Sequence, residues 1–138
     1  MTVRTTLLFA LGFVGAFVGC MSAEAEEERV LLAAIEALRD APAEDLGGRK
    51  NLLSALEKKP ARSPEALRAR DSCVEAYRLL LEGKEGTEAV KRALGGAGPV
   101  PATLLADLAA AEEKIKKSSD EAMPACEKAT AELRHRRR

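Results

Sequence analysis

The spacing of apolar residues is the feature that most constrains the fold of this chain. From residue 24 onward they recur at steps of three and four, the period of one face of an α-helix. No stretch alternates apolar and polar residues as a half-buried β-strand does. The same segment is rich in Ala, Leu, Glu, Lys and Arg, which are good helix formers. The sequence therefore predicts an all-α fold, a small bundle of four to five helices.

Capping residues place the first three expected helices. The first is expected over about 24–39, and the second is less regular because a Gly-Gly pair at 47–48 interrupts it. Ser63-Pro64-Glu65 is typical of a helix start, because serine caps, proline suits the first helical position and glutamate faces the positive end of the helix dipole. We therefore expect the third helix to begin at residue 64.

Helix breakers place the remaining elements. Gly83 is the expected C-terminal stop of the third helix, and a short fourth helix is expected over 87–94. The sequence GGAGPVP, residues 95–101, predicts a linker. A last helical segment over about 102–134 contains a proline, so we expect it to bend or break between residues 118 and 124.

The first twenty residues indicate export. Residues 7–19, LLFALGFVGAFVG, contain no charged or strongly polar side chain. Thirteen residues is short for a membrane span of about 20 and typical of the core of a signal peptide. The run ends in FVGC, residues 17–20, which resembles the lipobox of bacterial lipoproteins. The resemblance implies that residues 1–19 are a lipoprotein signal peptide and that Cys20 becomes the first mature residue and carries acyl chains such as palmitate.

Two alternatives to the lipid anchor remain open. Ala23 and Ala25 have the spacing that an ordinary signal peptidase recognises, and cleavage after Ala25 would release a soluble periplasmic or secreted protein. Residues 5–23 could instead stay in place as an uncleaved anchor. We favour the lipid because the apolar run ends directly at Cys20. Met21 follows the cysteine in place of an aspartate, which by analogy with the enterobacterial sorting rule indicates an outer-membrane lipoprotein of the cell envelope, facing the periplasm or the cell surface.

The number of cysteines is consistent with export. The chain has three, and acylation or removal of Cys20 leaves Cys73 and Cys126. Both lie on apolar stripes of different expected helices. An even pair in an oxidising compartment is typical of a disulfide, so we predict a disulfide between Cys73 and Cys126. The alternative is two separate buried thiols.

Composition excludes several kinds of function. The 22 basic and 22 acidic side chains balance, so no overall field attracts nucleic acid. Tyr77 is the one aromatic residue after Cys20, too few for the stacking surfaces of sugar-binding or single-strand-binding proteins. His135 is the one histidine, which argues against a His-based catalytic pair or metal cluster. We expect no catalytic residues, no metal site, no cofactor and no small-molecule substrate, and we expect Tyr77 to be a core residue, with a binding hot spot as the alternative.

Two charged segments flank the predicted bundle. Residues 20–28 form an acidic tether and helix start, 29–134 the helical bundle domain, and 135–138 a basic tail. The acidic start EAEEE could bind a divalent cation loosely, but a solvated helix start explains it better. The terminal RHRRR could touch anionic lipid headgroups, or it could be a frayed helix end whose cations complement the helix dipole.

The sequence favours an interaction protein over an enzyme. We expect an exported, envelope-anchored small helical adaptor or assembly partner, held at the membrane through Cys20 and binding other envelope proteins. The alternative is a soluble periplasmic or secreted helical binder, such as an inhibitor or immunity-type protein, released after Ala25. No nucleic acid is expected among the partners.

Overall fold

The structure, a computed structural model, describes residues 22–138, and Cys20 lies outside that range. All regular secondary structure in the described residues is helical, which confirms the predicted all-α class. The elements in chain order are α1 (Ala23–Asp40), α2 (Leu46–Glu57), α3 (Pro64–Gly95), α4 (Leu104–Lys117), a five-residue π-helical turn η1 (Ser118–Ala122) and α5 (Met123–Arg136).

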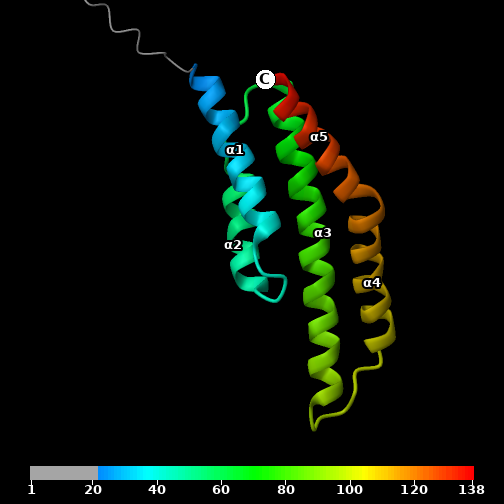
Figure 1. Cartoon of the computed structure of the whole chain (residues 1–138). Helices are drawn as coiled ribbons and strands as arrows, with labels where there is room; N and C mark the ends of the chain where they lie inside the picture. The colour runs from blue at the N-terminus through cyan, green and yellow to red at the C-terminus, as the bar shows by residue number, and fades with distance from the viewer. Residues whose placement is uncertain (1–21) are drawn as a thin grey trace, which may run out of the picture.

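The central element of the bundle is α3, which packs against every other helix (Figure 1). The chain runs up and down, so α1 descends, α2 ascends, α3 descends along the whole molecule, and α4, η1 and α5 ascend together. The shorter pair α1 and α2 lies beside α3 from its start to past its middle, where Lys50 of α2 lies 2.8 Å from Glu85 of α3. The last turns of α3 and the first turns of α4 therefore form the end of a two-helix hairpin that projects beyond the other helices.

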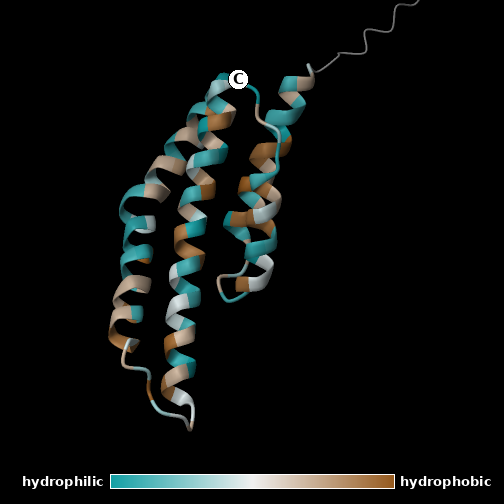
Figure 2. Cartoon of the chain, turned by 180° about the vertical axis from the view of Figure 1, so that it is seen from behind, coloured by the Kyte–Doolittle hydropathy of each residue, from teal (hydrophilic) through white to brown (hydrophobic). Residues whose placement is uncertain are grey.

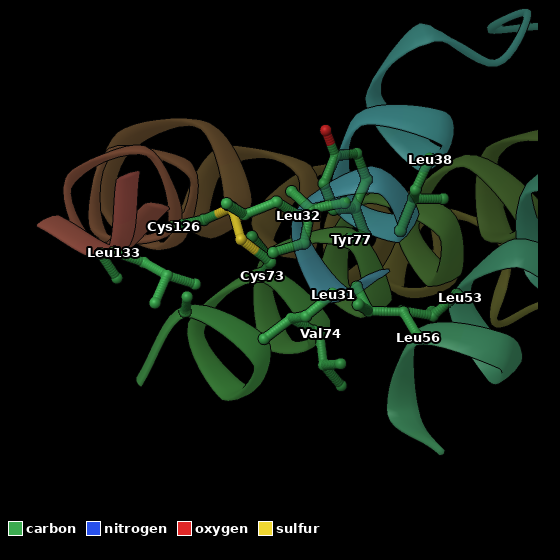
Figure 3. Close-up of a cluster of buried hydrophobic side chains, with 14 of the residues drawn as sticks. Leu31, Leu32, Leu38, Leu53, Leu56, Cys73, Val74, Tyr77, Cys126 and Leu133 are labelled. Carbon is green, nitrogen blue, oxygen red and sulfur yellow. A yellow bond between two sulfur atoms is a disulfide. The ribbon is translucent and has the colours of Figure 1, made fainter. Parts of the chain in front are cut away.

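The core is built mainly from leucine and alanine. The largest fully buried side chains come from α1, α2, α3, η1 and α5 and are Leu31, Leu38, Leu56, Leu81, Leu133, Cys73 and Ser118. Figure 3 shows how the aliphatic side chains gather around the single tyrosine and the sulfur atoms. Because the core contains one aromatic ring, that of Tyr77, and several of its other members are alanines, it stabilises this chain less than a core with several buried aromatic rings would.

A disulfide joins Cys73 of α3 to Cys126 of α5, as predicted (Figure 3). The two Cα atoms are 4.5 Å apart and the residues are separated by 53 positions in sequence. In the chain-entropy model, closing a loop of this length stabilises the fold by about 4 kcal/mol. The disulfide is therefore a large part of the stability of so small a core.

Helix α3 runs unbroken from Pro64 to Gly95, so the predicted stop at Gly83 and the separate helix over 87–94 are wrong. Gly83 is buried in the middle of α3, facing α4. A Cβ atom there would lie 2.6 Å from Ile115 Cγ1 and 2.7 Å from the carbonyl oxygen of Ala111. The glycine is thus required by a close approach of two helices, a tertiary contact that helix-stop statistics do not contain.

The expected interruption near residue 118 is confirmed, because α4 and α5 are joined by the π-helical turn η1. Ser118, which occupies a core position in the apolar pattern, is 1% exposed, and its hydroxyl donates a hydrogen bond of 2.8 Å to the carbonyl oxygen of Ala76 on α3. Pro124 then occupies the first turn of α5, where its missing N–H is tolerated.

Candidate interaction surface

The projecting hairpin depends on two glycines of α3. Gly83 and Gly86 both face α4, and a Cβ at Gly86 would lie 2.8 Å from the Cβ of Ala111. Ala111 is the one residue of α4 that is buried, at 4% exposure. Small residues on both sides let the two helices approach closely.

Exposed aliphatic side chains gather at the far end of this hairpin. Within residues 22–138, three of the four large apolar side chains with high exposure lie there: Leu94 in the last turn of α3 is 61% exposed, Val100 in the loop 55% and Leu105 in the first turn of α4 81%. Brown and tan ribbon marks this end of the two helices in Figure 2. Single exposed leucines are common on protein surfaces, but clusters of them mark interaction sites.

The same end of the molecule carries no charge. Residues 93–106 are fourteen consecutive uncharged residues, whereas the next longest uncharged runs after residue 24 have six. We call residues 93–106 the distal tip. In a chain with 32% charged residues, so long a run stands out as a surface of different chemistry.

A shallow groove between α3 and α4 leads into the distal tip. It has a volume of about 450 Å³ and is floored by small apolar residues, among them Gly86, Ala89 and Ala110. Ala93 and Leu104, which line its far end, belong to the distal tip. Glu82, Asp107 and Lys114 also line the groove, and Lys114 lies 2.8 Å from Glu82, so the groove joins the tip to charged side chains of both helices.

A second groove, of about 820 Å³, lies between the α1–α2 connection and the hairpin. Its walls carry charges of both signs, from Glu44, Asp45, Lys84, Glu88 and Lys91. Lys91 already donates a 2.7 Å hydrogen bond to Glu88. This groove therefore presents charges of both signs beside apolar side chains such as Leu46 and Ile115.

At the opposite end of the bundle, four charged side chains and one serine join α1, α3 and α5. We call this cluster the charge clamp: Glu24, Glu28, Ser63, Glu65 and Arg136. The Arg136 guanidinium lies 2.5 Å from Glu24, 3.3 Å from Glu28 and 2.8 Å from Glu65. The Glu28 side chain is 5% exposed and accepts a 2.7 Å hydrogen bond from the Ser63 hydroxyl. The clamp thus ties the start of α1 and the start of α3 to the end of α5.

These contacts change the interpretation of both charged segments. The glutamates of EAEEE are paired with arginines, since Glu26 also meets Arg29 and Glu27 meets Arg62. Helix α5 continues to Arg136, and Arg134 is 2.6 Å from Glu36 of α1. Thus Arg134 and Arg136, within RHRRR, hold α1 in place and do not fray into solvent.

The hydrogen bonds of the clamp shift the pKa of its groups. A hydrogen bond from its own backbone N–H lowers the pKa of the Glu65 carboxyl, and the Arg136 guanidinium lowers it further. The hydrogen bond to Glu24 raises the pKa of Arg136, so this cation is charged at every physiological pH. Both shifts favour the charged forms of Glu65 and Arg136, which strengthens their ion pair.

Tyr77 lies in the core, as predicted, at 5% exposure (Figure 3). Burial raises the pKa of its hydroxyl, while the cations of Arg49 and Arg39 oppose the shift. The Arg49 guanidinium carbon stands 5.6 Å from the ring centroid in a cation–π contact. A tyrosine that stays protonated and is covered by an arginine supports packing and offers no reactive phenolate.

The predicted site residues lie in different places. Cys73 and Cys126 form the disulfide, and Cys20, the predicted lipid attachment site, is outside the described residues. His135 is exposed in the last turn of α5. Across residues 22–138, no three or more His, Cys, Asp or Glu side chains converge as metal ligands would. Over the same range, none of the helices has the length and apolar character needed to cross a bilayer.

Sequence reasoning missed the distal tip as a surface. The segment GGAGPVP predicts a linker, and most of it does connect α3 to α4, but this pattern carries no information about the helix ends on either side. The signal that would have found the tip is the absence of charge through residues 93–106, which extends past the linker into both helices.

Comparison of the chain with protein-family models, with curated proteins and with solved structures finds no match. The function is therefore inferred from the chain itself.

Proposed function

We propose that this chain is an exported, envelope-anchored helical interaction protein, tethered by acyl chains on Cys20, that presents the distal tip to partners and catalyses no reaction. The membrane proposed for the tether is the outer membrane, by analogy with the sorting rule applied to Met21.

The observation that carries this proposal is the separation of the two ends of the bundle. Glu65 of the charge clamp is in the first turn of α3, and Leu94 of the distal tip is in its last turn. At a rise of 1.5 Å per residue, the 32 residues of α3 span about 48 Å. Since α1 begins at the clamp end, a tether at Cys20 would direct the apolar tip away from the membrane surface.

The start of α1 favours the lipid over the alternative cleavage. Ser22 is the N-cap of α1, and its side chain accepts a 3.2 Å hydrogen bond from the backbone N–H of Ala25. Removal of residues 1–19 would keep this cap and Glu24 of the clamp. Cleavage after Ala25 would remove both, at a cost of about 1 kcal/mol for the cap alone.

A pair of variants tests the anchor. Cys20→Ser should move the protein from the membrane fraction to the soluble fraction or leave it unprocessed, because the acyl acceptor is gone. As a matched control, Ala23→Leu with Ala25→Leu removes the small residues that an ordinary signal peptidase requires and should leave maturation unchanged. If Ala23→Leu with Ala25→Leu blocked processing and Cys20→Ser did not, the result would support the soluble binder instead.

A further inference from the structure

We propose that Arg49 is a binding site for a small, singly charged carboxylate, which its guanidinium holds beside the ring of Tyr77. The residues that form this site all lie in the described part of the chain, and none of them belongs to the charge clamp or the distal tip. The site and the tether at Cys20 can therefore fail separately.

Arg49 is the buried polar residue that the fold leaves without a polar partner. Five polar or charged residues of the described range are buried: Glu28, Arg49, Ser63, Ser118 and Thr130. The other four all form hydrogen bonds, from Ser63 to Glu28 and from Ser118 and Thr130 to backbone carbonyl oxygens. Arg49 is 6% exposed, its Nε atom has no hydrogen-bond partner, and no carboxylate of residues 22–138 forms an ion pair with it. A buried charge without a counter-ion opposes folding, so this residue calls for an explanation.

The position of Arg49 in α2 adds to this cost. Arg49 is the fourth residue of the helix, close to the positive end of its dipole, where a cation is disfavoured. The first turn contains no acidic residue to offset it. The carboxylate of the N-cap, Asp45, accepts a 2.8 Å hydrogen bond from the backbone N–H of Gly48. An anion bound at Arg49 would therefore offset both the side-chain charge and the positive end of the helix.

Tyr77 covers the guanidinium of Arg49 but cannot satisfy its N–H groups. The guanidinium carbon lies 5.6 Å from the ring centroid. An aromatic face attracts a cation, but it offers no oxygen to accept the hydrogen bonds that a guanidinium donates in its own plane. The Nε atom is shut off from solvent, whereas the two Nη groups are not among the buried atoms without a partner. The Nη groups are therefore where an anion can reach this side chain.

The surroundings favour a small carboxylate over other anions. Two Nη groups present parallel N–H donors that match the two oxygens of a carboxylate. Because the side chain is 6% exposed, only a small anion can reach it. The charges of Asp40 and Glu127 raise the pKa of the neighbouring Tyr77, and Arg39, which lowers that pKa, is already paired with Asp40 at 2.8 Å. These carboxylates would oppose the second charge of a phosphate more than the single charge of a carboxylate.

Tyrosine fluorescence of the full-length chain tests the site, because Tyr77 is its one tyrosine and the chain has no tryptophan. Sodium acetate should give a saturable change at millimolar concentration, and sodium chloride at the same ionic strength should give none. Arg49→Met keeps the apolar stem and should abolish the change. Arg49→Lys keeps the charge without the fork and should weaken binding by about tenfold or more. Arg78→Met removes an exposed arginine next to Tyr77 in sequence and, as the matched control, should bind acetate as the parent does.

Thermal melting gives a second measurement of the same site. Acetate at ten times its Kd should raise the Tm of the parent by about 5 °C over chloride at equal ionic strength and should leave Arg49→Met unchanged. In chloride alone, Arg49→Met should melt no lower than the parent, because it removes an unpaired buried cation. Circular dichroism checks that each variant is folded.

Three results would overturn the proposal. They are a parent chain that does not respond to acetate, an Arg49→Met variant that responds as the parent does, and a Tm of Arg49→Met in chloride well below that of the parent. The last result would make Arg49 a structural residue that only packs on Tyr77. None of these measurements depends on acylation of Cys20, so the proposed function would stand or fall by the fractionation experiment alone.

Discussion

Exchanging one methyl group between α3 and α4 tests the close approach on which the projecting hairpin depends. Gly86→Ala places a Cβ 2.8 Å from the Cβ of Ala111. Overpacking of this kind costs about 1–3 kcal/mol, while the better helix propensity of alanine returns about 1 kcal/mol. The expected net loss is up to about 2 kcal/mol. The reverse change, Ala111→Gly, loses about 1 kcal/mol of helix propensity and about 0.8 kcal/mol for the buried methyl group.

The double variant is the informative one. In Gly86→Ala with Ala111→Gly the two changes in helix propensity cancel, and the methyl group moves from α4 to α3. The clash is removed as well, because the next atom near a Cβ at position 86 is the Cα of residue 111, at 3.7 Å. Its free energy of unfolding should therefore lie within about 0.5 kcal/mol of the parent, against a sum of single losses of about 2–4 kcal/mol.

Urea denaturation of the chain carrying Cys20→Ser, with the disulfide intact, measures these values, and equal m-values show that the comparison is valid. The control pair is Gly86→Ala with Ala109→Gly, because Ala109 is exposed on α4 and makes no such contact. That pair should be additive within about 0.5 kcal/mol. If the Gly86 and Ala111 changes were also additive, the two helices would not approach as described.

Three further predictions concern stability. Replacing both Cys73 and Cys126 by serine should lower the free energy of unfolding by about 4 kcal/mol. A reducing agent should lower the free energy of unfolding of the parent chain and leave that of the double serine variant unchanged. Ser63→Ala removes both the N-cap of α3 and the donor to a buried glutamate, so unfolding in urea should show a loss of about 2 kcal/mol. The pKa of Glu65 is lowered from 4.5, so its stabilisation of the fold is complete above pH 4.5 and is lost as the pH falls through its lower folded value. Thermal melting at pH 7 and pH 3 should therefore differ less in Glu65→Gln than in the parent, and an unchanged difference would refute the role of its pair with Arg136.

The parts of the fold that depend on local chemistry could be predicted from the sequence. Ser63 caps α3 as expected because capping needs only the residues of one turn. The pairing of Cys73 with Cys126 followed from their place on apolar stripes and from the expected compartment. The predicted stop at Gly83 is wrong because the role of this glycine is set by Ala111 and Ile115 of α4, which lie much further along the chain.

The charged ends of the chain show the same limit. Arg136 and Glu24 are 112 residues apart in sequence, and no periodicity within either segment indicates that they form an ion pair. The distal tip is different, because the run of uncharged residues is visible in the sequence. The sequence does not show that α1 and α2 end before they reach the distal tip, which leaves the leucines of the tip exposed.

Mass spectrometry of the amino-terminal peptide from the envelope fraction tests the central claim most directly. The tethered, membrane-distal arrangement requires a mature chain that begins at Cys20 and carries the added mass of two or three acyl chains. A first residue at Glu26 without modification, or an intact chain that begins at Met1, would contradict it.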